Sequence, residues 1–158
     1  MAKVNYIIGD ATNPVTIGNK IIVHVCNDIG GWGKGFVMAI TKRWKQPEQQ
    51  YRQWFKSNDK FSLGQVQFVQ VEKELWVANL IGQHKINKDE NGNAPIRYEA
   101  ILEGLEKVAQ FAIDKKATIH MPRIGCGLAG GTWDKIEPLI NKSLLENELE
   151  TYVYDFSK

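Results

Sequence analysis

The sequence lacks the features that mark membrane, secreted and disulfide-rich proteins. No run of apolar residues is long enough to cross a bilayer, and the opening residues Met-Ala-Lys-Val-Asn-Tyr do not resemble a secretory signal. The 158 residues include only two cysteines, Cys26 and Cys126, which cannot make a disulfide framework. We therefore expect a cytoplasmic protein in which both thiols stay reduced as small, buried side chains.

The sequence also has no excess of one charge and no grouping of metal ligands. It carries 20 basic and 18 acidic residues, whereas a nucleic-acid-binding protein usually presents a basic face. The three histidines and two cysteines are not closely paired, so neither a zinc site nor a Cys–His nucleophile is indicated. These absences predict no metal, no cofactor, and no nucleic-acid or membrane partner.

The segments that are present alternate between strand-like and helix-like, which indicates an α/β domain. Helical spacing of apolar residues predicts helices that begin near residues 36, 47, 98 and 133, with Pro138 in the first turn of the last helix or bending it. Strand-like segments cover residues 3–9, 20–26, 65–71, 75–81, 117–121 and 151–156, and the third and fourth form a hairpin. Residues 1–158 therefore predict one domain with a three-layer α/β/α fold around a mixed, mostly parallel sheet. The polar stretch 83–95 is a predicted mobile surface loop.

Two glycine-rich loops each follow a predicted strand and precede a predicted helix. The first is Gly30-Gly31-Trp32-Gly33-Lys34-Gly35, and the second runs Arg-Ile-Gly-Cys-Gly-Leu-Ala-Gly-Gly from Arg123 to Gly131. Glycine lets backbone N–H groups approach a ligand, and open α/β sheets bind ligands at the carboxyl ends of their strands. The pair predicts a clamp around a phosphate-bearing anion. The alternative is that both loops are tight turns that need positive φ.

Neither of two common nucleotide-binding motifs accounts for these loops. Gly125, Gly127 and Gly130 match G-x-G-x-x-G, but the remaining strands of a dinucleotide-binding half would have to come from earlier sequence, and the first loop has no role in that fold. No G-x-x-x-x-G-K-[ST] occurs, and no Ser or Thr follows Lys34 to hold magnesium. A hydride-transfer enzyme and a P-loop enzyme therefore both fit poorly.

Taken together, the motifs resemble the macrodomain family of ADP-ribose-binding modules nearly end to end. Gly9-Asp10-Ala11-Thr12 resembles the Gly-Asp-Ile-Thr motif that follows the first strand in that family. His24-Val25-Cys26-Asn27 with Gly33-Lys34-Gly35 resembles the first loop of one branch, and Pro122 to Leu128 resembles its second loop. That branch contains ADP-ribose 1″-phosphate phosphatases and terminal ADP-ribose glycohydrolases.

The resemblance implies roles for the binding residues. Asp10, with Ala11 beside it, would accept a hydrogen bond from the adenine amine, although a lone Asp there is otherwise read as an N-cap or turn residue. Tyr154 and Phe156 would flank the adenine; without the family they are ordinary strand aromatics. Backbone N–H groups of both loops would wrap the diphosphate, from Gly33, Lys34, Gly35, Phe36 and Val37 and from Arg123, Ile124, Gly125, Cys126, Gly127, Leu128, Ala129 and Gly130.

Departures from the family pattern bear on catalysis. Glycohydrolase members of the branch have a lysine after the middle strand and an aspartate after Gly-Cys-Gly-Leu, where this sequence has Gln83 or His84 and then Ala129. Lys85 lies one position away. Without a carboxylate beside it, a substrate phosphate meets less repulsion, so Ala129 suits a phosphatase.

Three residues are the candidates for the catalytic machinery. Asp28 and His84 could perform acid–base work, and Asn27 could orient the substrate at the distal ribose. The alternatives are that Asp28 shapes the loop, that His84 is a solvated loop residue and that Asn27 is a turn residue ending its strand.

The sequence therefore favours a macrodomain that binds ADP-ribose and hydrolyses ADP-ribose 1″-phosphate or a related terminal ADP-ribose derivative. Two alternatives remain open. One is a non-catalytic module that reads ADP-ribose or its polymers. The other is a glycohydrolase that acts on ADP-ribosylated protein with an altered set of catalytic residues.

Overall fold

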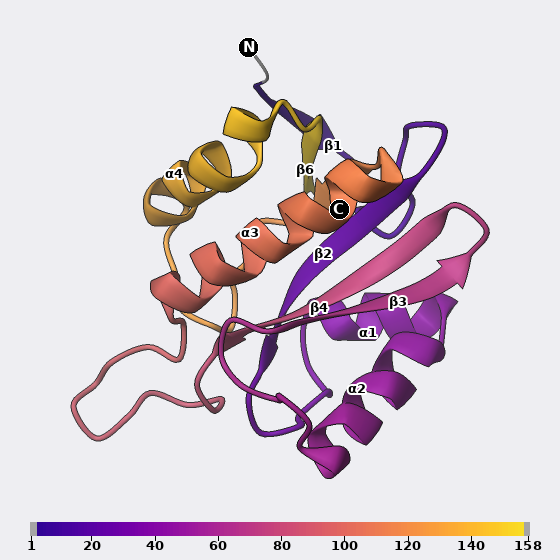
Figure 1. Ribbon diagram of the computed structural model, residues 1–158. Helices are drawn as coiled ribbons and strands as arrows, with labels where there is room; N and C mark the ends of the chain where they lie inside the picture. Colours follow the sequence, from indigo (N-terminus) through magenta and orange to yellow (C-terminus); the bar gives the residue numbers. More distant parts are fainter. Residues whose placement is uncertain (1–2, 157–158) are drawn as a thin grey trace.

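The computed structural model describes residues 3–156 and contains a six-stranded sheet between two layers of helices (Figure 1). The strands lie in the order β1-β6-β5-β2-β4-β3, and every neighbouring pair is parallel except the antiparallel pair β3 and β4. Their bounds are β1 (Val4–Ile8), β2 (Lys20–Asn27), β3 (Val66–Glu72), β4 (Leu75–Gln83), β5 (Thr118–Met121) and β6 (Thr151–Asp155). The predicted three-layer fold with a mixed, mostly parallel sheet is confirmed.

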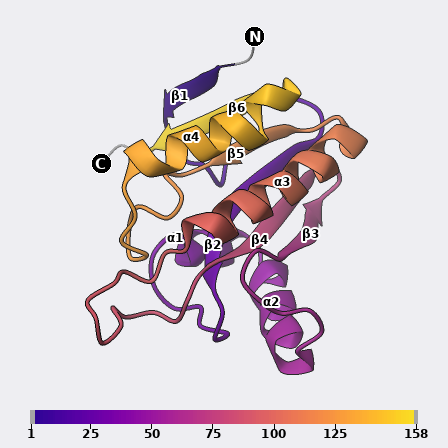
Figure 2. The same ribbon diagram turned by 60° about the vertical axis from the view of Figure 1, so that its left-hand side comes forward.

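The helices cover the two faces of the sheet in pairs. α3 (Tyr98–Lys115) and α4 (Trp133–Ser143) lie on one face, followed by a short 3₁₀ turn at Leu145–Asn147 (Figure 2). α1 (Phe36–Arg43) and α2 (Gln46–Ser57) lie on the other. α4 begins at Trp133, so Pro138 lies inside the helix and not in its first turn, which leaves the other predicted alternative, a bend in the helix.

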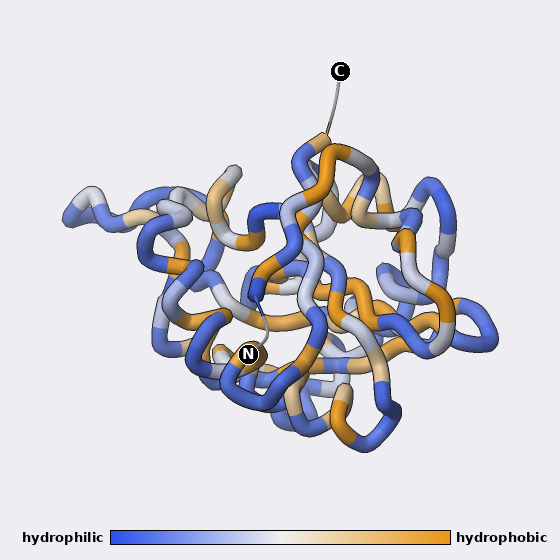
Figure 3. The backbone as a smooth tube through the Cα atoms, turned by 90° about the horizontal axis from the view of Figure 1, so that it is seen from above, coloured by the Kyte–Doolittle hydropathy of each residue, from blue (hydrophilic) through white to orange (hydrophobic). Residues whose placement is uncertain are grey.

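The central strands are buried on both faces because their side chains alternate between two cores. In β2, Ile21 and Val23 join the core beneath α3 and α4, while Ile22 and Cys26 join the core beneath α1 and α2. Such strands read as continuous apolar runs. In Figure 3 hydrophobic residues gather in the middle of the molecule, and hydrophilic residues predominate in the loops that project from it. Among residues 3–156, no helix is both long enough and apolar enough to span a bilayer.

The parallel arrangement brings five strand ends to one edge of the sheet. β1 leads to Asp10, and β2 leads to loop 1, which we define as residues 28–35. β5 leads to loop 2, defined as residues 122–132, and β6 ends beside it. β4 leads into a projecting loop, residues 84–96, which we call the bridging segment (Figure 1). Residues that are far apart in sequence therefore meet at this edge.

Candidate functional site

The side chain of Asn27 determines the shape of loop 1. Its Oδ1 accepts hydrogen bonds from the backbone N–H groups of Ile29 and Gly31 at 3.0 and 2.9 Å, and its Nδ2 donates to the Gly31 carbonyl at 2.9 Å. The buried Tyr51 hydroxyl from α2 donates to the Asn27 carbonyl at 2.6 Å. Asn27 is thus an organiser of the loop, and its predicted contact with a distal ribose stays a prediction.

Loop 1 ends in an open row of backbone donors at the start of α1. Gly35 has φ +84°, which only glycine adopts without strain, and this turns the chain into the helix. In the described part of the chain, the N–H groups of residues 33–37 have no acceptor. A Cβ added to Gly33 would meet no atom within 4 Å, so the surface above these donors is open. The positive end of the helix dipole adds to the attraction for an anion.

Loop 2 is held by its own backbone and faces loop 1. The Gly131 N–H donates to the Gly125 carbonyl at 2.7 Å, and the Gly130 N–H donates to the Gly127 carbonyl at 3.0 Å. A Cβ on Gly127 would also meet nothing within 4 Å, whereas one on Gly35 would lie 3.4 Å from Leu128. The two loops therefore touch at Leu128 and leave open space beside Gly127.

Apart from Leu128, which is 63% exposed, the large side chains of loop 2 are buried or already have partners. Ile124 and Ala129 are buried in the core. Arg123 donates to both carboxylate oxygens of Asp155, at 2.7 and 2.9 Å, and its guanidinium lies between two aromatic rings of Tyr6 and Trp133. Arg123 thus joins loop 2 to β6, and sequence reasoning missed this ion pair. A ligand in loop 2 would meet backbone groups.

Cys126 shows no sign of an activated thiol. Partial burial raises its pKa, although Arg123 acts in the opposite direction. A nucleophilic cysteine needs a lowered pKa. Within residues 3–156 no three His, Cys, Asp or Glu side chains gather as metal ligands.

Asp10 is a turn residue with one carboxylate oxygen directed at an arginine. Its Oδ1 accepts hydrogen bonds from the N–H and hydroxyl of Thr12, at 2.8 and 2.7 Å, and its Oδ2 lies 3.4 Å from Arg43 of α1. Partial burial acts to raise the pKa of Asp10, but the hydrogen bonds from Thr12 and Arg43 outweigh it and hold the pKa below its usual value. The group is therefore an anionic acceptor at neutral pH.

The two aromatic residues predicted to flank an adenine differ in exposure. Phe156 is 78% exposed just beyond β6, whereas Tyr154 is 3% exposed. The Tyr154 hydroxyl accepts from the Val15 N–H at 3.1 Å and lies 2.7 Å from His120 Nδ1. Of these two aromatic side chains, Phe156 is therefore the one whose ring is accessible to a ligand at this edge.

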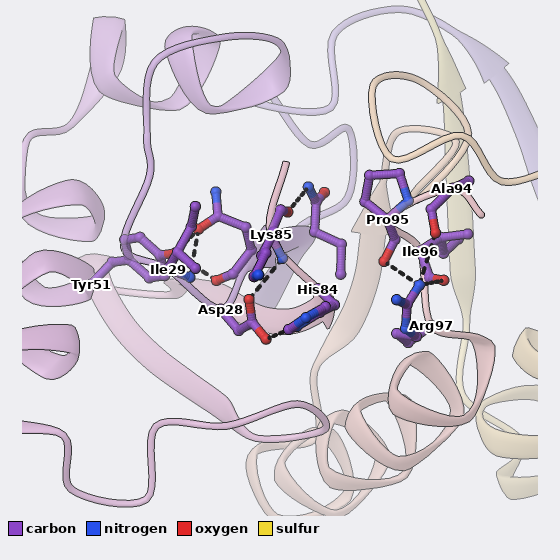
Figure 4. A network of polar contacts seen from close by, with 11 residues as sticks. Asp28, Ile29, Tyr51, His84, Lys85, Ala94, Pro95, Ile96 and Arg97 are labelled. Carbon is purple, nitrogen blue, oxygen red and sulfur yellow. Dashed lines mark hydrogen bonds and ion pairs between the residues drawn. The ribbon is translucent and has the colours of Figure 1, made fainter. Parts of the chain in front are cut away.

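Asp28 of loop 1 and His84 at the start of the bridging segment form a hydrogen-bonded pair (Figure 4). The Asp28 Oδ2 lies 2.7 Å from His84 Nδ1, and its Oδ1 accepts from the Lys85 N–H at 2.8 Å. Each carboxylate oxygen of Asp28 therefore already has a hydrogen-bond partner, and the carboxylate lies on the Nδ1 side of the His84 ring. The contact fixes the His84 ring with Nε2 as its remaining nitrogen.

The bridging segment contacts both loops. At its start, Ile86 packs on Gly31 of loop 1, and at its end the Ile96 N–H donates to the Ala129 carbonyl at 3.0 Å.

One Nη of Arg97, at the start of α3, holds the end of the bridging segment by donating to the carbonyls of residues 94, 95 and 96 at 2.8 to 3.0 Å (Figure 4). No motif marks Arg97 in the sequence, so its role could be found only in the structure. A hollow beside His84 is lined by Lys85, Arg97 and other residues of this segment.

Comparison with solved structures finds close likenesses over the whole chain. A protein of unknown function from Bacteroides thetaiotaomicron is 57% identical, with a TM-score of 0.97 and coverage of 98% of both chains. A macrodomain protein from Streptomyces coelicolor is 50% identical, with a TM-score of 0.88, and covers 98% of this chain and 100% of its own. Thermosipho africanus DarTG, solved in complex with ADP-ribose, shares the fold at 16% identity, with a TM-score of 0.70 over 88% of this chain and 38% of its own.

Two groups of curated proteins are also similar, and no family model matches the sequence. The chromodomain-helicase-DNA-binding protein 1-like of Mus musculus is 34% identical over 99% of this chain, which spans only 18% of that protein's length. The ADP-ribose 1″-phosphate phosphatase of Candida albicans is 24% identical over 88% of this chain and 92% of its own.

Proposed function

Because the chain belongs to the macrodomain family, we propose that it binds ADP-ribose at the edge formed by loops 1 and 2 and hydrolyses ADP-ribose 1″-phosphate. The support from relatives is a structural neighbour solved with ADP-ribose and a phosphatase of that name that is similar over most of its length. The rest of the support comes from the site itself.

The binding half of the proposal rests on the open backbone donors. The free N–H groups of residues 33–37 and the open surface at Gly127 face one another across the contact between Gly35 and Leu128. A diphosphate carries charge that suits backbone donors at a helix N-terminus. Asp10 would accept from the adenine amine, and the exposed ring of Phe156 would lie against the base.

The catalytic half rests on one observation, the hydrogen bond between Asp28 and His84. If Nδ1–H donates to Asp28, then Nε2 carries the free lone pair and can take a proton from water. That water attacks phosphorus, the bond between phosphorus and the 1″-oxygen breaks, and the imidazolium returns the proton to the leaving oxygen. The products are ADP-ribose and inorganic phosphate. Ala129 leaves no carboxylate to repel the phosphate.

An assay of phosphate release from ADP-ribose 1″-phosphate tests the catalytic half. His84→Gln should lower kcat by about 100-fold or more while leaving the Kd for ADP-ribose unchanged, because general acid–base catalysis contributes factors of that size. Lys142→Gln, on the exposed last turn of α4, is the control and should retain activity. Wild-type protein that binds ADP-ribose without releasing phosphate would contradict the phosphatase and favour a binding module.

A charged side chain at Gly127 tests the binding half. Because a Cβ there meets no atom, Gly127→Glu should fold normally and place a carboxylate where the diphosphate would lie. Calorimetry should then show loss of ADP-ribose binding. Asn91→Glu, on the exposed tip of the bridging segment, adds the same charge elsewhere and should bind as wild type. Unchanged affinity in Gly127→Glu would overturn the proposed site.

Lys85 gives a specific reason to assay a second reaction. It lines the same hollow as His84, and it lies one position from the place where glycohydrolase members of the family have their lysine. Release of ADP-ribose from ADP-ribosylated protein, abolished by Lys85→Gln and not by His84→Gln, would favour that activity over phosphate release.

A further inference from the structure

The segment that carries Asp10 crosses β5 and β6 and leaves its two large aliphatic side chains, Val15 and Ile17, exposed. Val15 is 59% exposed and Ile17 is 94% exposed. Hydrophobic contact therefore holds this stretch only weakly, since an exposed side chain gains little from burial. Hydrogen bonds from polar groups, which we call anchors, must therefore hold the segment in place.

Those anchors form a chain of hydrogen bonds beneath the segment. The Val15 N–H donates to the Tyr154 hydroxyl at 3.1 Å, and that hydroxyl lies 2.7 Å from His120 Nδ1. His120 Nε2 lies 2.8 Å from the Thr118 hydroxyl and 3.1 Å from the Thr16 hydroxyl. This chain of hydrogen bonds begins at Val15 of the segment, runs through the buried side chains of Tyr154 on β6 and His120 on β5, and ends at Thr16 of the same segment.

The donors and acceptors of this chain run in one direction. Burial lowers the pKa of His120 to about 3, so the ring is neutral and has one donor and one acceptor nitrogen. The Tyr154 hydroxyl accepts from Val15 and donates its own proton to Nδ1, which places the ring proton on Nε2. Nε2–H then donates to a threonine hydroxyl. Every group in the chain is satisfied only in this arrangement.

The anchored segment is stiff between Val15 and Asp10. The Asn13 N–H donates to the Asp10 carbonyl at 2.9 Å, and the intervening Ala11 and Thr12 are buried. Pro14 fixes its own φ next to the anchor. A displacement at Val15 is therefore transmitted to the carboxylate of Asp10.

We propose that Tyr154 is a positioning residue for adenine recognition, which acts through Val15 to hold Asp10 in place and does not itself touch the base. The proposal rests on the proposed function, because it requires ADP-ribose as the ligand. In this arrangement a buried hydroxyl, which the ligand does not contact, controls how well the protein distinguishes adenine from other bases.

Base discrimination gives a readout that a merely structural role would not change. We compare the affinities for ADP-ribose and for inosine diphosphate ribose, in which a carbonyl oxygen replaces the adenine amine. Wild type should prefer ADP-ribose by about tenfold, the effect of one lost hydrogen bond and an unpaired acceptor. Tyr154→Phe should reduce the preference to less than about threefold. Tyr152→Phe is the matched control, since its hydroxyl bonds to Glu150 just before β6 and the substitution keeps the ring that stacks on His120.

A second variant and a measurement without ligand keep the test decisive. Thr16→Val breaks the other anchor at the partly exposed segment and should weaken the preference as well. Hydrogen exchange at residues 11–17 should be faster in both anchor variants than in Tyr152→Phe. An undiminished preference or unchanged exchange in Tyr154→Phe would overturn the positioning role while leaving the proposed function intact. Wild type that binds neither ligand would overturn both.

Discussion

Asn27 combines three hydrogen-bonding roles in one residue, two in its side-chain amide and one in its backbone carbonyl. Its oxygen accepts from two backbone N–H groups of loop 1, its nitrogen donates to a carbonyl of the same loop, and its own carbonyl accepts from Tyr51. A side chain used in this way fixes the path of the backbone for the next four residues. The positions of the open donors at the end of loop 1 therefore depend on a residue that precedes the loop.

Removing this amide should affect stability and binding together. Asn27→Ala leaves the Gly31 N–H and carbonyl without their partner, which should lower the free energy of unfolding by about 1–3 kcal/mol and raise the Kd for ADP-ribose about tenfold or more. Urea denaturation and calorimetry measure the two effects. Tyr51→Phe, which removes a hydroxyl that lies 2.6 Å from the Asn27 carbonyl and 2.9 Å from its Oδ1, should have the smaller effect on the Kd. A stability loss with unchanged affinity would exclude loop 1 from the site.

At the residue scale, candidate polar side chains could be named from the sequence, but the hydrogen-bond partner of each could not. The sequence names Asp28 and His84 as acid–base candidates but not as partners, and it is the parallel pairing of β2 and β4 that brings them together. The pairing of Arg123 with Asp155 and of Tyr154 with Val15 could not be predicted, because each joins residues more than 30 positions apart whose side-chain directions depend on strand register.

α3 lies close to β4 because one glycine faces the strand. A Cβ on Gly104 would clash with the side chain of Leu80, which fills the space beneath the helix. The helix backbone thus rests almost directly on a buried leucine. This close approach positions the start of α3, and with it Arg97 and the end of the bridging segment.

The packing of α3 predicts that a single added methyl group destabilises the protein. Gly104→Ala improves helix propensity but forces Leu80 or the helix to move, so the free energy of unfolding should fall by about 1–3 kcal/mol. Glu106→Ala, on the exposed side of the same helix, should change stability by less than about 0.5 kcal/mol. A more stable Gly104→Ala variant would mean that helix and strand are less tightly packed than described.

The tip of the bridging segment is an ordered turn around Asp89. Its Oδ1 accepts from the N–H groups of Asn91 and Asn93, both at 2.9 Å. Asp89→Ala should therefore speed hydrogen exchange at residues 90–93 while leaving the Kd for ADP-ribose within about twofold, because the contacts to loops 1 and 2 lie at the ends of the segment. A large loss of affinity would show that the tip itself reaches the ligand.

Elements with a regular apolar period were predicted closely, and irregular ones were not. The hairpin of β3 and β4 and the long α3 follow from spacing alone. The sequence presented residues 83–95 only as a polar loop, because nothing local indicates that Ile86 and Ile96 attach it to two different loops. Those contacts come from the sheet order, which no periodicity encodes.

Two buried histidines make the stability of the whole molecule depend on pH. Burial lowers the pKa of His24 to about 4 and that of His120 to about 3, from an ordinary value of 6.5. Below pH 6.5 the unfolded chain binds protons that the folded protein does not. Stability is therefore full above pH 6.5 and falls as the pH decreases toward 4.

The slope that each of these histidines contributes to the free energy of unfolding should be about half of 1.4 kcal/mol per pH unit at pH 6.5 and should approach about 1.4 below it. Urea denaturation of wild type at several pH values between 6.5 and 4.5 measures the sum. In His120→Gln the slope well below pH 6.5 should decrease by about 1.4 kcal/mol per unit, whatever the variant's stability at pH 7.5. An unchanged slope would show that His120 is protonated in the folded state.

The strand order also has a consequence for synthesis of the protein. In the described structure β1 pairs only with β6, so the earliest synthesised of these six strands cannot pair until the latest of the six has left the ribosome. Until β6 has left the ribosome, the segment that carries Asp10 lacks two of its hydrogen-bond partners, the Tyr154 hydroxyl and the Asp155 carbonyl. The nascent chain can assemble β2, β3 and β4 early, but its ligand edge is completed only after translation has passed every other strand.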